Sequence, residues 1–299
     1  MILYLTYWFP QAYLARYIAM FQTAIPLASV IGGPLASVIL GMEGIAGLHG
    51  WQWLFILEGM PAVVAAFAVL KLLSDGPAQA TWLTIEEKTV IADRIARDQT
   101  TERRSFWLSL RDPRVLTMGL VLFGVTAGGQ YGVGLWLPQI VQRMGFSNQE
   151  TGFIVALPYI VAVPTMILWG RSSDLRRERV WHIAIPLLLG SGCFAVASVT
   201  QDNLVEFVAL AITAIVAITS FPPMNSLVKS MLSGSAAASG VALYNSVGNL
   251  GGFAGPYIIG ALQKDDGSNA ASMAVLATLL LFSACLVLAL GRVLAAPPA

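Results

Sequence analysis

Charged residues are scarce in this chain. Only 11% of its 299 residues are Asp, Glu, Lys or Arg, whereas soluble chains carry about 25%. The 17 basic and 16 acidic side chains nearly cancel to a formal net charge of +1, which excludes a strongly basic nucleic-acid-binding protein. Apolar residues make up 57% of the sequence, and the mean hydropathy is +0.72. This composition excludes an ordinary soluble domain and predicts a membrane protein.

Cysteine and histidine are also scarce, with two residues of each. Cys193 and Cys285 lie in separate apolar runs and show neither metal-ligand spacing nor a disulfide framework. His49 and His182 fall at the ends of predicted spans on opposite sides of the membrane, so they cannot share a metal ion. No glycine-rich phosphate loop follows a strand. A membrane-embedded hydrolase would need Ser, His or paired Asp residues at the same depth in the membrane, and the predicted spans place none in this way. We therefore expect no metal, no cofactor and no enzymatic activity.

Long apolar runs are abundant, and they indicate the fold class. A helix needs about 20 residues to cross the ~30 Å hydrocarbon core of a bilayer. Met1–Phe9 is too short to do so, and we interpret it as the tail of a helix whose beginning is absent; a free interfacial anchor is the alternative. The sequence predicts an all-α polytopic membrane protein with eight full transmembrane helices and this partial N-terminal one. The eight predicted spans are Tyr17–Gly41, Trp51–Leu73, Val115–Leu137, Thr151–Trp169, Trp181–Val199, Leu204–Met224, Ala236–Leu262 and Ala271–Arg292.

The positions of lysine and arginine predict the orientation of these spans. If the Arg16 end of the first full span lies in the cytoplasm, only Arg143 and Lys264 of the 17 basic residues fall on the opposite side. Such an asymmetry obeys the positive-inside rule. We expect both termini of the chain in the cytoplasm and, for a bacterial source, a location in the inner membrane.

One connection between spans, residues 74–114, is long and polar. Thr84 and Glu87 have the spacing of a capping box, which predicts the start of a short amphipathic helix. We interpret this segment as a cytoplasmic linker. It separates residues 1–73, a remnant of an N-terminal bundle, from residues 115–299, a C-terminal six-helix bundle.

Polar residues inside the spans are the candidate substrate contacts, because they are costly in lipid and usually face a cavity or a partner. Gln130 and Tyr131 lie in a stretch with four glycines in seven residues, from Gly128 to Gly134. Glycine weakens a helix by about 1 kcal/mol relative to alanine. The stretch therefore predicts either a bend that exposes Gln130 and Tyr131 to substrate or close packing of the GxxxG type.

Asparagines provide a second group of candidates. Asn245 and Asn249 are four residues apart and so share one helix face, which suits hydrogen bonding to a carboxylate or hydroxyl. Asn225 follows Pro222-Pro223, where a broken helix would leave unpaired carbonyl groups. Gln22, in the first full span, is a weaker candidate of the same kind. Hydrogen bonding between helices is the structural alternative for all of them.

Two carboxylates lie within predicted spans. Glu58 would sit about 10 Å deep at 1.5 Å per residue, where it is either a proton relay or a structural hydrogen-bonding group. Glu206 lies at a span edge, and we expect it to be solvated.

The segment Gly170–Arg179 is strongly charged although apolar runs flank it on both sides. Lipid-spanning helices must leave the bilayer to turn, and basic residues at such turns favour the cytoplasm. We interpret this segment as a tight cytoplasmic hairpin between two membrane helices.

The same segment resembles a signature loop of the major facilitator superfamily, G-x-x-x-D-[RK]-x-G-[RK]-[RK]. Gly170 and Asp174 match, whereas Leu175 departs from the basic position and Arg177 replaces the second glycine. Within the superfamily, the anion:cation symporter family of organic-acid permeases looks closest. The other segments that carry the resemblance are Leu3–Pro10, Ile31–Leu35, Trp51–Gly59, Arg111–Arg114, Leu135–Gln139, Leu157–Tyr159 and Gly240–Gly252.

The resemblance implies alternating access, in which two six-helix halves rock about a central site. It implies proton-coupled symport of a small organic anion by a monomer in the lipid bilayer. Gln130, Tyr131, Asn245 and Asn249 would be the contacts of the C-terminal half. Aligned with the family, the chain begins at the end of the fourth helix, so it looks like a fragment. A transport-inactive membrane remnant or scaffold and a polytopic membrane enzyme are the alternatives.

The resemblance also implies a role for the hairpin as a cytoplasmic latch. Asp174 would approach the start of the first full span near Arg16, where a helix N-terminus favours a carboxylate. Arg171 or Arg177 would add charge-assisted hydrogen bonds that hold the inner gate shut. Gly170 completes this gating group.

Overall fold

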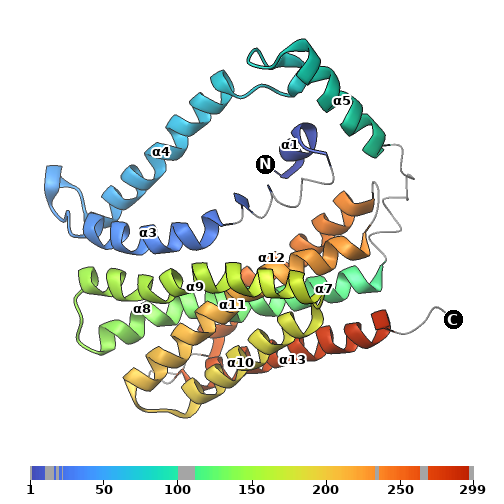
Figure 1. The fold of residues 1–299 in the computed structure, drawn as a ribbon. Helices are drawn as coiled ribbons and strands as arrows, with labels where there is room; N and C mark the ends of the chain where they lie inside the picture. Colours follow the sequence, from blue (N-terminus) through green and yellow to red (C-terminus); the bar gives the residue numbers. More distant parts are fainter. Residues whose placement is uncertain are drawn as a thin grey trace. The chain divides into compact units, whose positions relative to one another are not determined.

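The computed structural model describes residues 2–10, 17, 20–21, 23–99, 112–232, 236–262 and 269–295. Every regular element within these ranges is helical, and the chain divides into two compact units, Met1–Arg103 and Arg104–Ala299 (Figure 1). An all-α fold was the prediction, and it is confirmed.

The first unit contains a pair of packed helices, α3 (Ala24–Leu40) and α4 (Gly50–Leu72). Glu43 ties the loop between them to α4, since its carboxylate accepts hydrogen bonds from the Gly50 amide at 2.7 Å and from His49 Nδ1 at 2.6 Å. These two hydrogen bonds, chiefly the one from the Gly50 amide, hold the pKa of Glu43 below its ordinary value. On α4, the Glu58 side chain is exposed and has no hydrogen-bond partner within the described ranges.

A short N-terminal helix, α1 (Ile2–Trp8), contacts the start of the linker. Tyr4 donates a hydrogen bond to the carbonyl oxygen of Ser74 at 2.9 Å, and the Trp8 indole stacks on Trp82. The linker helix α5 (Ile85–Gln99) begins at the predicted capping box, in which Thr84 and Glu87 exchange hydrogen bonds between side chain and backbone. The short helix predicted to start at this point corresponds to α5.

The described residues of the second unit form a bundle of six helical rods (Figure 1). The first rod is continuous but has three parts, α7 (Pro113–Gly124), a π-helical segment η3 (Val125–Gly132) and α8 (Val133–Arg143). The others are α9 (Asn148–Arg176), α10 (Val180–Val199), α11 (Asn203–Met231), α12 (Ala236–Leu262) and α13 (Ala270–Ala295). Helix α10 packs against α11 and α13, α9 packs against α11, and α12 packs against α7 and η3.

Large apolar side chains fill the centre of this bundle. Trp136, Phe194, Leu210, Met224 and Leu276 are each 1% exposed or less. They come from α8, α10, α11 and α13, so the core joins helices that are distant in sequence. Packed against one another, such side chains stabilise the bundle through many van der Waals contacts.

Within the described part of the chain, six helices are long and apolar enough to cross a membrane, namely Gly50–Leu72, Pro113–Arg143, Asn148–Arg176, Val180–Val199, Asn203–Met231 and Ala270–Leu294. The two remaining predicted spans coincide with α12 and with the described part of the first span, α3. Several helices begin before the predicted boundaries because capping residues precede the apolar runs. Asp112, Ser147 and Asp202 each accept hydrogen bonds from the first-turn amides of α7, α9 and α11.

The predicted hairpin is shorter than expected. Gly170–Arg176 continues α9 as regular helix, and only Arg177–Arg179 forms the turn before α10. The charged residues do not end the helix because arginine and leucine are good helix formers once they leave the hydrocarbon. Gly170, Arg171 and Asp174, which were predicted to form a latch, therefore lie on a helix and not in a loop.

Candidate functional site

The turn between α9 and α10 has a left-handed residue at its centre. Arg177 adopts φ 49° and ψ 32°, a conformation that glycine reaches without steric cost. This is the position where the signature loop has its second glycine. The arginine retains the same turn, with its amide donating to the carbonyl oxygen of Asp174 at 3.2 Å.

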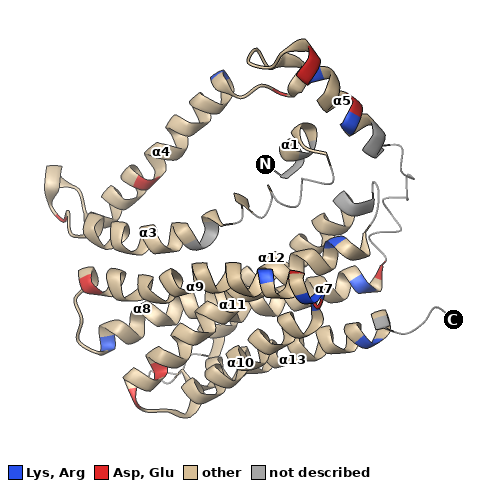
Figure 2. Cartoon of the chain, in the orientation of Figure 1, with Lys and Arg blue, Asp and Glu red and all other residues tan. Residues whose placement is uncertain are grey.

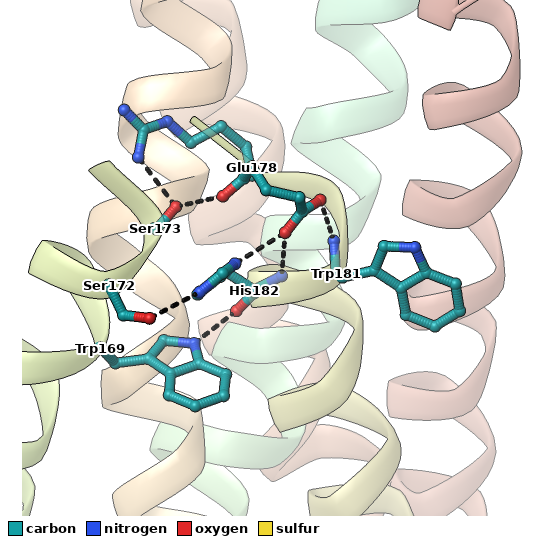
Figure 3. A network of polar contacts seen from close by, with 7 residues as sticks. Trp169, Ser172, Ser173, Glu178, Trp181 and His182 are labelled. Carbon is teal, nitrogen blue, oxygen red and sulfur yellow. Dashed lines mark hydrogen bonds and ion pairs between the residues drawn. The ribbon is translucent and has the colours of Figure 1, made fainter. Parts of the chain in front are cut away.

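Glu178 and His182 form the centre of a polar network beneath this turn (Figure 3). His182 Nδ1 lies 2.6 Å from Glu178 Oε2, and its Nε2 lies 3.2 Å from the hydroxyl of Ser172. An ionised carboxylate can only accept, so Nδ1 donates to Glu178. Trp169 lies against the ring and donates its indole N–H to the carbonyl oxygen of His182 at 2.8 Å.

The Glu178 carboxylate also caps α10. It accepts hydrogen bonds from the backbone amides of Trp181 at 2.7 Å and His182 at 3.1 Å. Partial burial raises the pKa of Glu178, but the bonds from His182 and from the two amides lower it by more, so the pKa lies below its ordinary value of 4.5. The ionised carboxylate therefore caps α10 at neutral pH and orients the His182 ring, whose Nε2 contacts Ser172 of α9.

Of the predicted latch residues, Asp174 and Gly170 make contacts with neighbouring side chains. Ser173 donates to the carbonyl oxygen of Glu178 and accepts from Arg179 Nη1 at 2.8 Å (Figure 3). Arg179 also pairs with Asp174, whose side chain remains 65% exposed. Gly170 faces Pro222 of α11, so that a Cβ there would lie 3.2 Å from the proline ring. The side chains of Arg171 and Arg177 are exposed, and the predicted partner Arg16 lies outside the described residues.

Gly128–Gly132 of the predicted glycine-rich stretch lie in η3, which packs tightly, whereas Gly134 lies in α8 and a Cβ there would meet nothing within 4 Å. A Cβ at Gly132 would lie 2.7 Å from Leu276 of α13, and one at Gly129 would overlap the side chain of Ala217 of α11. From α12, Gly251 abuts the carbonyl oxygen of Phe123, and a Cβ at Gly255 would lie 2.6 Å from that of Ala127. Close packing and an irregular helix thus occur together here, and π-helical turns of this kind are frequent at functional sites.

Tyr131, near the end of η3, lies against α12. A Cβ at Gly252 would be 2.7 Å from the Tyr131 ring, although the tyrosine itself remains 44% exposed. Asn249 is one turn from Gly252 on the same helix, is exposed and has no hydrogen-bond partner within the described part of the chain. Two predicted substrate residues from distant parts of the sequence therefore lie on neighbouring helices.

The other predicted substrate residues differ in their surroundings. Gln130 is exposed on η3, whereas Asn245 is half-buried and donates its amide to the carbonyl oxygen of Val241 at 3.0 Å. Asn225 is half-buried in α11, which continues through Pro222 and Pro223. The expectation of a broken helix is wrong, because two prolines remove only their own amide bonds and the buried helix tolerates that loss. Gln22 lies outside the described residues.

The expectation that Glu206 is solvated is also wrong. Its side chain is 9% exposed, and both carboxylate oxygens lie 3.0 Å from Nη2 of Arg143. This pair joins the end of α8 to the start of α11. The partner explains how the bundle accepts a carboxylate at this position.

Glu178, His182 and the Arg143–Glu206 pair were not among the predicted site residues. Glu178 and His182 are four residues apart at a helix start, a spacing that predicts contact. No local pattern connects Arg143 to Glu206, because 63 residues separate them.

Basic residues concentrate at one end of this bundle, to the right in Figure 2. Arg114, Arg179, Lys229 and Arg292 belong to that end, where α7 and α10 begin and α11 and α13 finish. Arg143 lies at the opposite end, at the C-terminus of α8.

The chain is similar to proteins of known family. Residues 1–256 match the model of the Major Facilitator Superfamily. A candidate tartrate transporter of Agrobacterium vitis is 42% identical over 294 residues, which cover 97% of this chain and 65% of that protein. A quinolone resistance transporter of Acinetobacter baumannii is 36% identical over 287 residues, covering 94% of this chain and 66% of that protein. The chain thus spans about two thirds of the length of these relatives.

A solved structure shares the fold. It is that of a bacterial homologue of the human lysosomal transporter Spinster, in an inward-facing and unoccupied conformation. The TM-score is 0.71 at 17% identity, with 96% of this chain and 73% of that chain covered. With its long apolar helices, this chain is a multi-pass membrane protein, and it belongs to the Major Facilitator Superfamily.

Proposed function

We propose that this protein takes part in secondary active transport of a small organic anion, coupled to protons, by alternating access. The observation that carries the proposal is the meeting of Tyr131 and α12. The exposed tyrosine lies against Gly252, one turn from the exposed Asn249. A phenol hydroxyl and a carboxamide can both donate hydrogen bonds to a carboxylate or a substrate hydroxyl.

We propose Gln130, Tyr131, Asn249 and the free carbonyl oxygen of Asn245 as the polar contacts of the C-terminal half, with Asn225 and Gln22 as further candidates. The name of the Agrobacterium relative supports tartrate, a four-carbon dihydroxy dicarboxylate, as the substrate to test first. Neutral donors alone compensate a dianion poorly. We therefore expect cationic groups outside this half-site to contribute to binding.

Uptake into proteoliposomes that contain the chain tests this function. With an acidic exterior, labelled tartrate is expected to accumulate above its external concentration, and a protonophore is expected to abolish the accumulation. A quinolone measured in parallel separates the two kinds of substrate that the relatives' names suggest. Equal tartrate entry with and without the pH gradient would refute proton coupling, and no entry above protein-free vesicles would refute transport.

We also propose that the end of the bundle that carries Asp174 faces the cytoplasm and forms part of the inner gate. The basic residues at that end support this orientation by the positive-inside rule. The contacts of Ser173, Glu178 and His182 support a hairpin of fixed shape, from which Arg171 and Arg177 extend into solvent. These two arginines are free to bind carboxylates or helix C-termini when the gate closes.

Asp174→Asn tests the gate. The substitution removes the charge that pairs with Arg179 while it preserves the size of the side chain. We expect slower tartrate uptake with unchanged membrane insertion, which cysteine labelling at both ends of the bundle reports. A transport rate equal to that of the wild type would contradict the gating role.

A further inference from the structure

Gly252 is the residue of α12 on which the Tyr131 ring lies. A Cβ built at Gly252 would be 2.7 Å from Cε2, 3.1 Å from Cζ and 3.2 Å from Cδ2 of the tyrosine. Its three nearest neighbours thus all belong to this ring. The absence of a side chain at position 252 makes room for the ring, and any larger residue would have to displace it.

The backbone beneath the ring leaves no alternative adjustment. Gly251 abuts the carbonyl oxygen of Phe123, and a Cβ at Gly255 would be 2.6 Å from the carbonyl oxygen of Ala127. Helix α12 and the α7–η3 rod are therefore in backbone contact on both sides of Gly252. Because packed interiors transmit strain rather than absorb it, an added methyl group would move the ring and not the helices.

The Tyr131 ring has a packed side and an exposed side. It is held against α12 on one side, and it is 44% exposed on the other. Displacement away from Gly252 therefore moves the phenol toward its exposed side, and in the proposed half-site, with Asn249 one turn from Gly252, that side is where the anion would bind.

We propose that Gly252 is a specificity-determining residue, which sets the size of anion that the half-site accepts by fixing the height of the Tyr131 ring above α12. The inference rests on the proposed function, because it takes Tyr131 as a substrate contact. It adds a residue that does not itself touch the anion. A Tyr131 ring that lies farther from α12 leaves less room for the anion, so long anions should lose more affinity than short ones.

The test compares two probes on the purified chain, namely tartrate with four carbons and glucarate with six. In Gly252→Ala, the ratio of glucarate to tartrate affinity is expected to fall by about 10-fold or more, the scale that a misplaced methylene group produces. Gly260→Ala is the matched control, because Gly260 lies on the same helix and a Cβ there would meet nothing within 4 Å. This control is expected to retain the wild-type ratio.

A double substitution distinguishes the proposed route from a general disturbance of α12. In a Tyr131→Ala background the ring is gone, so Gly252→Ala is expected to change neither the affinity ratio nor the melting temperature. An equal effect of Gly252→Ala in both backgrounds would overturn the inference. If Gly252→Ala alone fails to fold, recovery of the folded protein in the double variant supports the contact, and failure of both variants refutes it.

The inference and the proposed function can fail separately. If the wild type binds both probes and Gly252→Ala keeps their ratio, the specificity role is wrong while the half-site stands. If the wild type binds neither probe, the half-site itself is refuted, and the specificity role falls with it. The melting temperatures of the four variants still report whether Gly252 and Tyr131 are in contact.

Discussion

Single residues at the α9–α10 turn show how a local departure from a motif is accommodated. Arg177 adopts the left-handed conformation that glycine prefers. For an L-residue with a Cβ, this conformation costs about 1–2 kcal/mol. The bonds made by Ser173, Glu178 and Arg179 surround the turn and hold it in this conformation.

Arg177→Gly is therefore expected to stabilise the protein. Removing the steric cost gains more free energy than glycine loses through its greater freedom in the unfolded chain. We therefore expect the free energy of unfolding to rise by about 0.5–1 kcal/mol, measured by thermal unfolding in detergent. Arg176→Gly is the control, since Arg176 is still helical and glycine there should destabilise by up to about 1 kcal/mol. A lower melting temperature for Arg177→Gly would contradict the assignment of strain.

The charge of Glu178 makes a pH-dependent contribution to stability. Burial raises its pKa, but the bonds from His182 and from the amides of α10 lower it to below 4.5. A folded-state pKa below the unfolded one means that the stabilisation is complete above about pH 4.5 and is lost as the pH falls through the folded value. Wild type is expected to melt higher than Glu178→Gln at pH 7, and the difference should shrink as the pH falls below about 4.5. A difference that stays constant over this range would show that the ionised carboxylate is not the stabilising species.

The existence of the long helices was predictable from the sequence because the length and hydropathy of a segment decide whether it can cross a membrane. Helix ends were not, since side chains such as Ser147 and Asp202 cap the helices before the apolar run begins. The π-helical form of Val125–Gly132 was also out of reach. It depends on contacts of Gly129, Gly251 and Gly255 with other helices, and no local pattern specifies such tertiary contacts. For the same reason the sequence indicated Tyr131 and Asn249 as candidates without indicating that they meet.

The Arg143–Glu206 ion pair joins α8 to α11, and its contribution to stability can be tested by substitution. Arg143→Met leaves Glu206 buried without its cation and is expected to destabilise the bundle by about 2–3 kcal/mol. Adding Glu206→Met is expected to restore most of this loss, because an apolar pair of similar volume replaces a buried ion pair with little cost. A double variant as unstable as Arg143→Met alone, measured by thermal unfolding, would show that the charge of Glu206 is not what Arg143 compensates.

At the scale of the whole molecule, one distribution of charge supports both the topology and the proposed gate. The basic residues lie mainly at the end of the bundle where α9 turns into α10 (Figure 2). The exposed polar groups Tyr131 and Asn249 lie on the helices between the two ends. In the proposed orientation, an anion that binds there would pass the basic end on its way to the cytoplasm, so the hairpin and the half-site would lie on one route.

The initial rate of tartrate uptake as a function of concentration, in proteoliposomes with wild type and Asn249→Ala measured side by side, tests this account most directly. Loss of one hydrogen bond to a charged ligand corresponds to about 1.5–3 kcal/mol. The account predicts saturable uptake by the wild type and a KM at least about 10-fold higher for Asn249→Ala. Saturable uptake with the same KM in both proteins would contradict the half-site at Tyr131 and Asn249, and absence of saturable uptake by the wild type would contradict transport itself.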